Sequence, residues 1–290
     1  MLAGAPRGLV AGAGVVLLLL SWLVLANILQ PLAQANNCAS DWEAAIVAAQ
    51  AGQTEYQGTC LSIGGLDQQD LSHLFSELDA QRHVVDTEAK RFTGDLWTTV
   101  GGYLGGFPSI VFATLIGAFV VGSSLSSGLA AWSISNGWRR PTWIAATVAS
   151  TLTLAAIGYL VVTLLGGLFI HFRVRGMGLT SNIPSPALEV IAPIPGLFFY
   201  GLVAAGIALI IGKGELAMLF SIVFLTLDFI GSAQVERAPY FPSSFQSAAV
   251  GAPEAKLGVW TGATILVVLA TFLALMLCWH FIRRKDIPDR

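Results

Sequence analysis

Long apolar stretches alternate with polar segments along the whole chain. A helix that crosses the roughly 30 Å hydrocarbon layer of a bilayer needs about 20 mostly apolar residues. Stretches of this kind occur at Gly8–Leu29, Leu96–Gly122, Thr142–Phe172, Ile194–Ile211, Leu216–Gly231 and Val259–Ile282. The pattern therefore predicts an all-α integral membrane protein with about six transmembrane helices.

Two of these stretches have alternative interpretations. The first could be a secretory signal peptide, because Arg7 precedes it and Ala33 and Ala35 form a cleavage-like site. Its apolar run is longer than the roughly 7–15 residues of a signal peptide, so we expect an uncleaved helix over residues 1–30. The fourth and fifth stretches are short and are separated by Gly212–Glu215, which favours a helical hairpin over a re-entrant pair.

The distribution of Lys and Arg indicates which side of the membrane each loop faces, because these residues are enriched in cytoplasmic loops. Six spans place both termini on one side of the membrane. That side would carry Arg7, Arg139, Arg140, Lys213, Arg283, Arg284, Lys285 and Arg290. The distribution predicts a multi-pass protein of the cell membrane with both termini in the cytoplasm.

Residues 31–95 form the one long polar segment, between the first two predicted spans, and residues 96–290 hold the other five spans. We expect this segment to be extracytoplasmic. Apolar residues recur in it at helical spacing, at Leu71, Leu74, Phe75, Leu78, Val85, Ala89 and Phe92. They predict an amphipathic helix that begins at the cap residue Asp70. Its apolar stripe would fold back on the membrane surface or on its own loop; a lid over a transport path is the alternative.

Cys38 and Cys60 both lie in the polar segment. Compartments outside the cytoplasm permit disulfides, and closing this loop would contribute about 2–4 kcal/mol in chain-entropy terms. We expect the bridge, with two free thiols as the alternative. Cys278 falls in the last predicted span, where a small apolar role is expected.

The composition also points to lipid as the main solvent. Hydrophobic residues make up 55% of the chain and charged residues 11%, with a mean hydropathy of +0.72. A net charge of −2 provides no basic surface for nucleic acid. His73 and His83 do not have the spacing of metal ligands, so no metal site is expected. The absence of GxSxG and HExxH sequences predicts no catalytic residues, and hence that the chain is not itself an enzyme.

Asp228 is the carboxylate that falls inside a predicted span. A charged group in the bilayer costs about 2.5–3.5 kcal/mol on insertion scales, which makes such a residue a functional candidate. It could line a polar path or pair with Arg173 or Arg175. Its nearness to Gly231 slightly favours the other interpretation, a carboxylate near the membrane interface that water reaches.

The turn between the second and third spans, residues 123–141, combines small residues with glycines. Gly128 and Gly137 bracket a short segment that contains Trp132 and Ser133. The residues that follow are typical of a membrane interface: Trp138, Arg139, Arg140 and Trp143.

In this turn and in its six-span plan, the chain resembles exporter-type (type-two) ABC transporter permeases, in particular small actinobacterial membrane subunits. Gly128, Gly137 and Arg140 match the landmarks of that family's turn, in which a glycine step and a short helix lead into a basic residue. The match in motif is limited to this turn, whereas the match in topology covers the chain. Ser124 and Ser126 stand where the family usually has acidic residues.

The resemblance implies the permease subunit of an ABC exporter for a hydrophobic or amphipathic substrate. The turn would then be a coupling helix, with Gly128, Trp132, Ser133, Gly137, Arg139 and Arg140 as its main residues. No cofactor would bind this chain: ATP and magnesium would bind a separate ATP-binding subunit, since the chain lacks a GxxxxGK[ST] sequence. The permease would pair with itself or a related permease. The two serines favour the alternative, a non-transporting accessory or sensory subunit of a larger complex.

Overall fold

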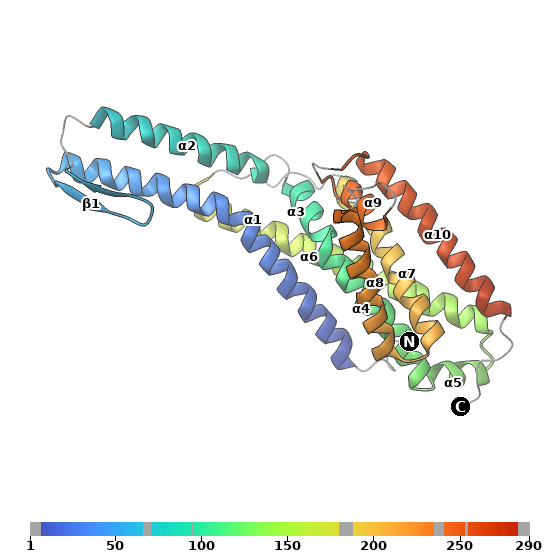
Figure 1. The fold of residues 1–290 in the computed structure, drawn as a ribbon. Helices are drawn as coiled ribbons and strands as arrows, with labels where there is room; N and C mark the ends of the chain where they lie inside the picture. The colour runs from blue at the N-terminus through green and yellow to red at the C-terminus, as the bar shows by residue number, and fades with distance from the viewer. Residues whose placement is uncertain are drawn as a thin grey trace.

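The computed structural model describes residues 7–65, 71–93, 96–179, 188–234, 241–252 and 255–283. Helices form nearly all of this part of the chain, with one short β-hairpin (Figure 1). Six of the described helices, α1, α4, α6, α7, α8 and α10, are long and apolar enough to cross a membrane. The predicted all-α membrane fold is confirmed.

The elements follow one another in this order: α1 (Arg7–Gln50), β1 (Glu55–Gln57), β2 (Ser62–Gly64), α2 (Leu71–Thr93), α3 (Leu96–Gly105), α4 (Phe107–Ser126), α5 (Leu129–Ser135), α6 (Arg140–Gly176), the 3-10 helix η2 (Leu188–Ile191), α7 (Ile194–Ile211), α8 (Gly214–Gln234), α9 (Pro242–Ala249) and α10 (Val259–Arg283). Asp70, the predicted cap of α2, and the basic residues Arg284, Lys285 and Arg290 lie outside the described residues.

α4 is the central helix of the bundle and contacts α1, α6, α7 and α8. A Cβ added to Gly117 of α4 would overlap the carbonyl oxygen of Gly201 in α7, so the two backbones touch. A Cβ on Gly122 would likewise overlap the backbone of Gly214, the first residue of α8. Small residues permit this close packing, which replaces the hydrophobic effect as the source of helix association in lipid.

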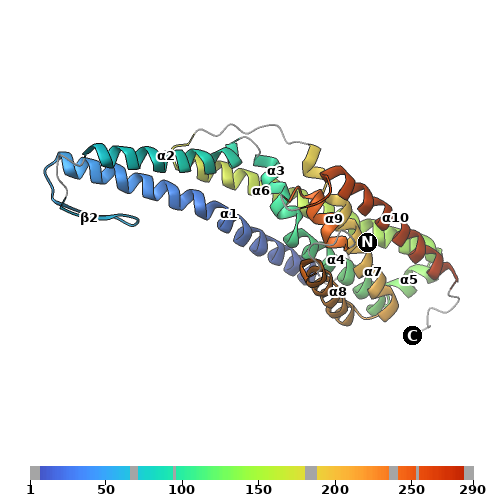
Figure 2. The same cartoon turned by 45° about the horizontal axis from the view of Figure 1, so that its top comes forward.

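α1 continues far past the predicted end of the first span, through Pro31 to Gln50. The reason is a second apolar stripe with spacings of three and four residues: Leu32, Ala35, Ala39, Trp42, Ile46 and Ala49. This is the heptad spacing of a coiled coil. α2 runs back along this part of α1, and the pair projects from the bundle (Figures 1 and 2). We call residues 32–65 together with α2 the stalk.

The apolar stripe of α2 is covered, as the amphipathic pattern predicted, and it faces the extension of α1. Its buried members are Leu74, Leu78, Val85, Ala89 and Phe92, each at most 6% exposed. Phe75 was also assigned to the stripe, and this was wrong because the heptad seam passes through Leu74 and leaves Phe75 46% exposed. Beside the seam, the guanidinium of Arg82 donates to Glu43 of α1 over 2.7 Å, and this hydrogen bond raises the pKa of Arg82.

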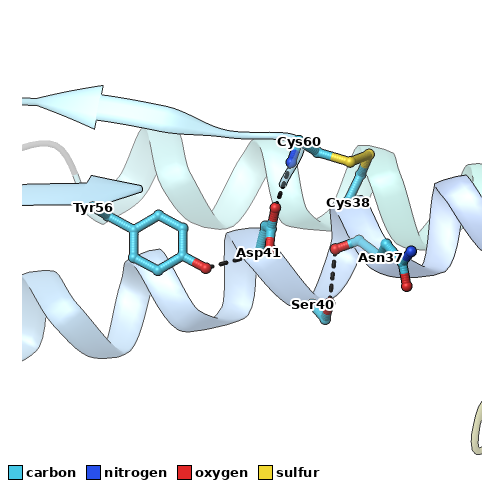
Figure 3. The surroundings of a disulfide bond; sticks show 6 residues. All are labelled: Asn37, Cys38, Ser40, Asp41, Tyr56 and Cys60. Carbon is cyan, nitrogen blue, oxygen red and sulfur yellow. Dashed lines mark hydrogen bonds between the residues drawn. A yellow bond between two sulfur atoms is a disulfide. The ribbon is translucent and has the colours of Figure 1, made fainter. Parts of the chain in front are cut away.

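A disulfide joins Cys38 of α1 to Cys60 in the β-hairpin, which is the pairing favoured from the sequence (Figure 3). Asp41, one turn further along α1, fastens the same hairpin. It accepts the backbone N–H of Cys60 over 2.6 Å and the hydroxyl of Tyr56 over 3.3 Å. A Cβ on Gly58 would lie 2.5 Å from the carboxyl carbon of Asp41, so a glycine is needed there.

The second predicted span is two helices rather than one. α3 ends at Gly105 and α4 begins at Phe107, with Pro108 in its first turn. Proline has no backbone N–H and cannot continue a helix from the preceding turn, so the chain restarts there. α3 packs against α6 and η2 rather than through the centre of the bundle.

The last three spans follow the sequence prediction. α7 and α8 are separate helices joined at Gly212, whose φ of +73° ends α7 in the left-handed region. Between α8 and α10 lies the short helix α9. The third span, α6, is longer than predicted at both ends.

We predict that the seam of the stalk protects its residues from a thiol reagent. In a Cys278→Ser background, Leu78→Cys should react at least about tenfold more slowly than His83→Cys, because reaction at Leu78 requires local opening of the two helices. His83 is exposed on the same helix and is the matched control. Labelling is monitored by mass spectrometry without reductant. Equal labelling rates at the two positions would contradict the coiled-coil seam.

Reduction of the Cys38–Cys60 bridge should loosen the β-hairpin while leaving the bundle folded. For a separation of 22 residues, the disulfide stabilises the folded state by about 3 kcal/mol, because it lowers the entropy of the unfolded chain. After mild reduction, or in the Cys38→Ser, Cys60→Ser variant, we expect limited proteolysis to cut within residues 51–61 first. The Cys278→Ser variant is the control and should resist cleavage as the parent does.

Candidate functional site

α5 is a separate seven-residue helix that joins α4 to α6 at one end of the bundle. Glycines with positive φ mark both of its ends, Gly128 at +70° and Gly137 at +90°. A Cβ at either position would meet nothing within 4 Å, so the backbone conformation, rather than space, explains the glycine. We call the end of the bundle that carries α5 and the α7–α8 turn the turn end.

One face of α5 is buried against the neighbouring spans. Ala130 is 3% exposed and forms a small apolar cluster with Trp143 and Ile144 of α6. Ser133 is 7% exposed on the same face. Trp143 was predicted as a residue of the membrane interface, and this was wrong: at 2% exposed, it fixes α5 to the start of α6.

The opposite face of α5 presents Trp132, which is 66% exposed. The carbonyl oxygen of Trp132 accepts the hydroxyl of Ser135 and the side-chain amide of Asn136, each over 2.8 Å. These two hydrogen bonds close the end of the short helix. α5 is therefore a short, capped helix with a large aromatic side chain on its outer face.

The two basic residues of the turn, Arg139 and Arg140, lie between α5 and the body of α6. Arg139 is exposed and has an extended backbone that leads into α6, and Arg140 begins that helix with Pro141 in its first turn. Trp138 is 42% exposed beside them. Of the predicted coupling residues, Ser133 alone faces the bundle; Trp132, Arg139 and the two glycines are open.

Asp228 lies at the other end of the bundle, near the start of α9. Its position on α8 is about 21 Å along the helix from Gly214, from the 1.5 Å rise per residue. The expected pairing with Arg173 or Arg175 is wrong, because the partners of Asp228 are Tyr200 and Ser243. Asp228 is also 5% exposed rather than open at the bundle surface, and its place along a polar path stays a prediction.

The carboxylate of Asp228 holds three helices together. Its Oδ2 accepts the hydroxyl of Tyr200 of α7 over 2.5 Å and the backbone N–H of Ser243 of α9 over 3.1 Å. The hydroxyl of Ser243 in turn donates to the carbonyl oxygen of Asp228 over 3.3 Å. The first N–H groups of a helix have no partner within it, so Asp228 supplies the N-terminal cap of α9 from a neighbouring span.

Gln246 fixes the other side of α9 to the helix breaks of the bundle. Its side-chain N–H₂ donates to the carbonyl oxygens of Gly105, at the end of α3, and Pro193, before α7, over 2.7 and 3.3 Å. Tyr159 of α6 acts similarly, since its hydroxyl donates over 2.7 Å to the carbonyl oxygen of Val190 in η2. We call Asp228, Tyr200, Ser243, Gln246 and Tyr159 the polar lock.

The sequence identified Asp228 but not its partners. Tyr200 and Gln246 lie in a span and in a polar loop, and neither has a local pattern that separates it from ordinary residues of its kind. The sequence signal that pointed to such partners was the interruption of the helices, because carbonyl groups at a helix break within a membrane need hydrogen-bond donors.

No group of three or more His, Cys, Asp or Glu side chains gathers in the described part of the chain. His73 is exposed and lies 3.9 Å from Glu77 of the same helix. His171 is 9% exposed, against the bundle.

Comparison of the chain with protein-family models, with curated proteins and with solved structures finds no match.

We predict that removal of the acceptor at Asp228 destabilises the bundle. In Asp228→Leu, the buried hydroxyl of Tyr200 and the N–H of Ser243 lose their partner, at about 1–3 kcal/mol for each unsatisfied group. Asp228→Asn keeps an acceptor oxygen and should lose less than half as much. The measurement is thermal unfolding of the full chain in detergent micelles.

Glu215→Gln is the matched control for this experiment, because Glu215 is an exposed carboxylate of the same helix. It should melt as the parent does. If Asp228→Leu melted like Glu215→Gln, the polar lock would not stabilise the fold.

Proposed function

We propose that the chain is the membrane-embedded permease subunit of an ABC exporter, with α5 as the element that contacts a separate ATP-binding subunit. The observation that carries the proposal is the geometry of α5. It is a short helix between two spans, anchored on one face and presenting Trp132 on the other. Exposed Trp and Arg residues are common at the centre of protein interfaces, and the turn offers Trp132 beside Arg139.

The proposed orientation places the turn end in the cytoplasm of a cell-membrane protein and the stalk outside. Arg139, Arg140 and Lys213 lie at the turn end, in the two connections that join α4 to α6 and α7 to α8. This agrees with the enrichment of Lys and Arg in short cytoplasmic loops. A disulfide in the stalk is compatible with an oxidising compartment on the other side.

Movement of α5 would reach the rest of the bundle through contacts already described. Ala130 packs on Trp143 and Ile144, so a tilt of α5 would shift the start of α6. α4 is joined to α7 through the backbone contact of Gly117 and Gly201, and would move α7 with it. Such a packed pair of helices can change arrangement as a rigid body, which is one way for ATP hydrolysis elsewhere to open a path.

ATP and magnesium belong to the partner subunit in this proposal, and a second permease copy, identical or related, completes the transporter. The substrate is hydrophobic or amphipathic, in keeping with spans that carry few charges.

A second candidate function is an accessory or sensory subunit that does not transport. The stalk favours it, because a coiled coil with a disulfide-fastened hairpin that projects from the bundle (Figure 1) offers a binding surface unrelated to transport. Ser124 and Ser126 also lack the charge expected near the coupling turn. Both hydroxyls instead donate to backbone carbonyls of their own helix, those of Val120 and Ser123.

The test is site-specific photo-crosslinking in native membranes. A benzophenone amino acid at position 132 should capture an ATP-binding chain, whereas the same probe at position 133 should not, because Ser133 faces the bundle. A probe at Phe75 of the stalk is the second control. The contrary outcome is that position 132 captures no ATP-binding chain, while position 75 captures other membrane or extracytoplasmic proteins. That outcome would overturn the transporter proposal in favour of the accessory subunit.

A functional variant follows from the same geometry. Trp132→Ala should lower substrate-stimulated ATPase activity of the assembled complex about tenfold or more, the cost typical of a central interface residue. Its melting temperature should not change, since the side chain is exposed. Trp260→Ala is the matched control: Trp260 is 52% exposed at the start of α10 and should leave the activity unchanged.

A further inference from the structure

A groove with a volume of about 520 Å³ lies between α1 and α6, at the base of the stalk. The small side chains of two alanines of α1, Ala26 and Ala33, keep the groove open, and Trp22 and Phe169 form its apolar walls. The volume falls within the roughly 300–1,000 Å³ of sites that bind small molecules.

The groove lies where both helices leave their apolar runs. The apolar run of α1 ends at Leu29 and is followed by the polar Gln30; the apolar run of α6 ends at Phe172 and is followed by Arg173. Gln30 and Arg173 both line the groove. The coincidence of the two polarity changes puts the groove at the boundary between hydrocarbon and headgroups on the stalk side of the membrane.

The polar part of the lining favours an anion. Arg173 contributes a guanidinium, and Asn27 and Gln30 contribute side-chain amides; all three residues are exposed. Within the described part of the chain, no salt bridge joins Arg173 to a carboxylate. A guanidinium binds phosphate through two parallel hydrogen bonds, and amide N–H groups can add to them.

The apolar part continues along the two helices into the span region. Leu18 lies one turn before Trp22 on α1, and Leu165 lies one turn before Phe169 on α6, each 51% exposed. A ligand held by Arg173 can therefore extend a hydrocarbon chain over these side chains. A free anion would use only the polar end of the groove.

We propose that this groove binds a phosphate-bearing anionic lipid, with the headgroup on Arg173, Asn27 and Gln30 and an acyl chain along Trp22 and Leu165. The site is distinct from α5, on the opposite side of the membrane, and does not depend on the proposed transport function. The groove is open between two spans, so a lipid can enter from the membrane sideways.

Arg175 provides a matched control. It is exposed near the same end of α6 and carries the same charge, but two residues of helix place it about 200° around the axis from Arg173. It does not line the groove. General attraction of anionic lipid to basic residues would involve both arginines equally, whereas a built site requires Arg173 alone.

The experiment uses the full purified chain in maltoside micelles, with adducts counted by native mass spectrometry. Three probes are titrated: a short-chain phosphatidylglycerol, the zwitterionic phosphatidylcholine of the same chain length, and inorganic phosphate. We expect one phosphatidylglycerol to bind in preference to phosphatidylcholine. Arg173→Gln should weaken that binding about tenfold, and Arg175→Gln less than about twofold, as expected for loss of one charge-assisted contact.

Two further measurements keep the proposal falsifiable. Ala26→Trp fills the groove without removing charge and should also abolish the preferred adduct, while the melting temperature of Arg173→Gln should equal that of the parent. Equal losses in Arg173→Gln and Arg175→Gln, or equal binding of phosphatidylcholine, would overturn the lipid site. Displacement of phosphatidylglycerol by an equal concentration of inorganic phosphate would show a site for the free anion and would also overturn it.

Discussion

Direct contact between helix backbones is the constraint on which the rest of this bundle depends. Lipid tails are as apolar as leucine, so burial of apolar surface does little to bring spans together within a membrane. α4 instead meets α7 at Gly117 and Gly201, and meets the start of α8 at Gly122 and Gly214. With α4 fixed in this way, α5 and α6 are positioned at one end, and the break before Phe107 at the other.

The break between α3 and α4 leaves backbone groups that need hydrogen-bond partners, and the polar lock provides them. Where α3 ends, its last carbonyl groups have no partners within the helix. Gln246 donates to the carbonyl oxygen of Gly105 there, Tyr159 donates to that of Val190 in η2, and Asp228 accepts from the start of α9. A buried donor left without a partner costs about 1–3 kcal/mol, so the interrupted helices and the lock depend on one another. Gly196 leaves room for the Gln246 side chain, since a Cβ there would overlap it.

The sequence predicted most of the spans because they are long apolar runs in which Asp228 is the one charged residue. It also predicted α2, whose apolar stripe faces a single partner. It missed the extension of α1, although the heptad spacing from Leu32 to Ala49 was present. Alanines at several of those positions weaken the contrast with the polar residues between them. The partners of Asp228 could not be predicted, because a tyrosine of one span and the backbone of Ser243 meet it only through the packing of three helices.

The continuity of α1 has a mechanical consequence. One unbroken helix runs from the turn end of the bundle to the tip of the stalk, and the part beyond Gln30 measures about 30 Å at 1.5 Å per residue. A pair of helices that packs along a continuous seam would act as a lever arm, with the contact of α1 with α4 and α6 as its pivot. A rotation of about 10° at that pivot would displace the tip by about 5 Å, from the same helix geometry. Angular changes too small to alter packing inside the bundle are therefore enlarged into displacements at the far end of the stalk.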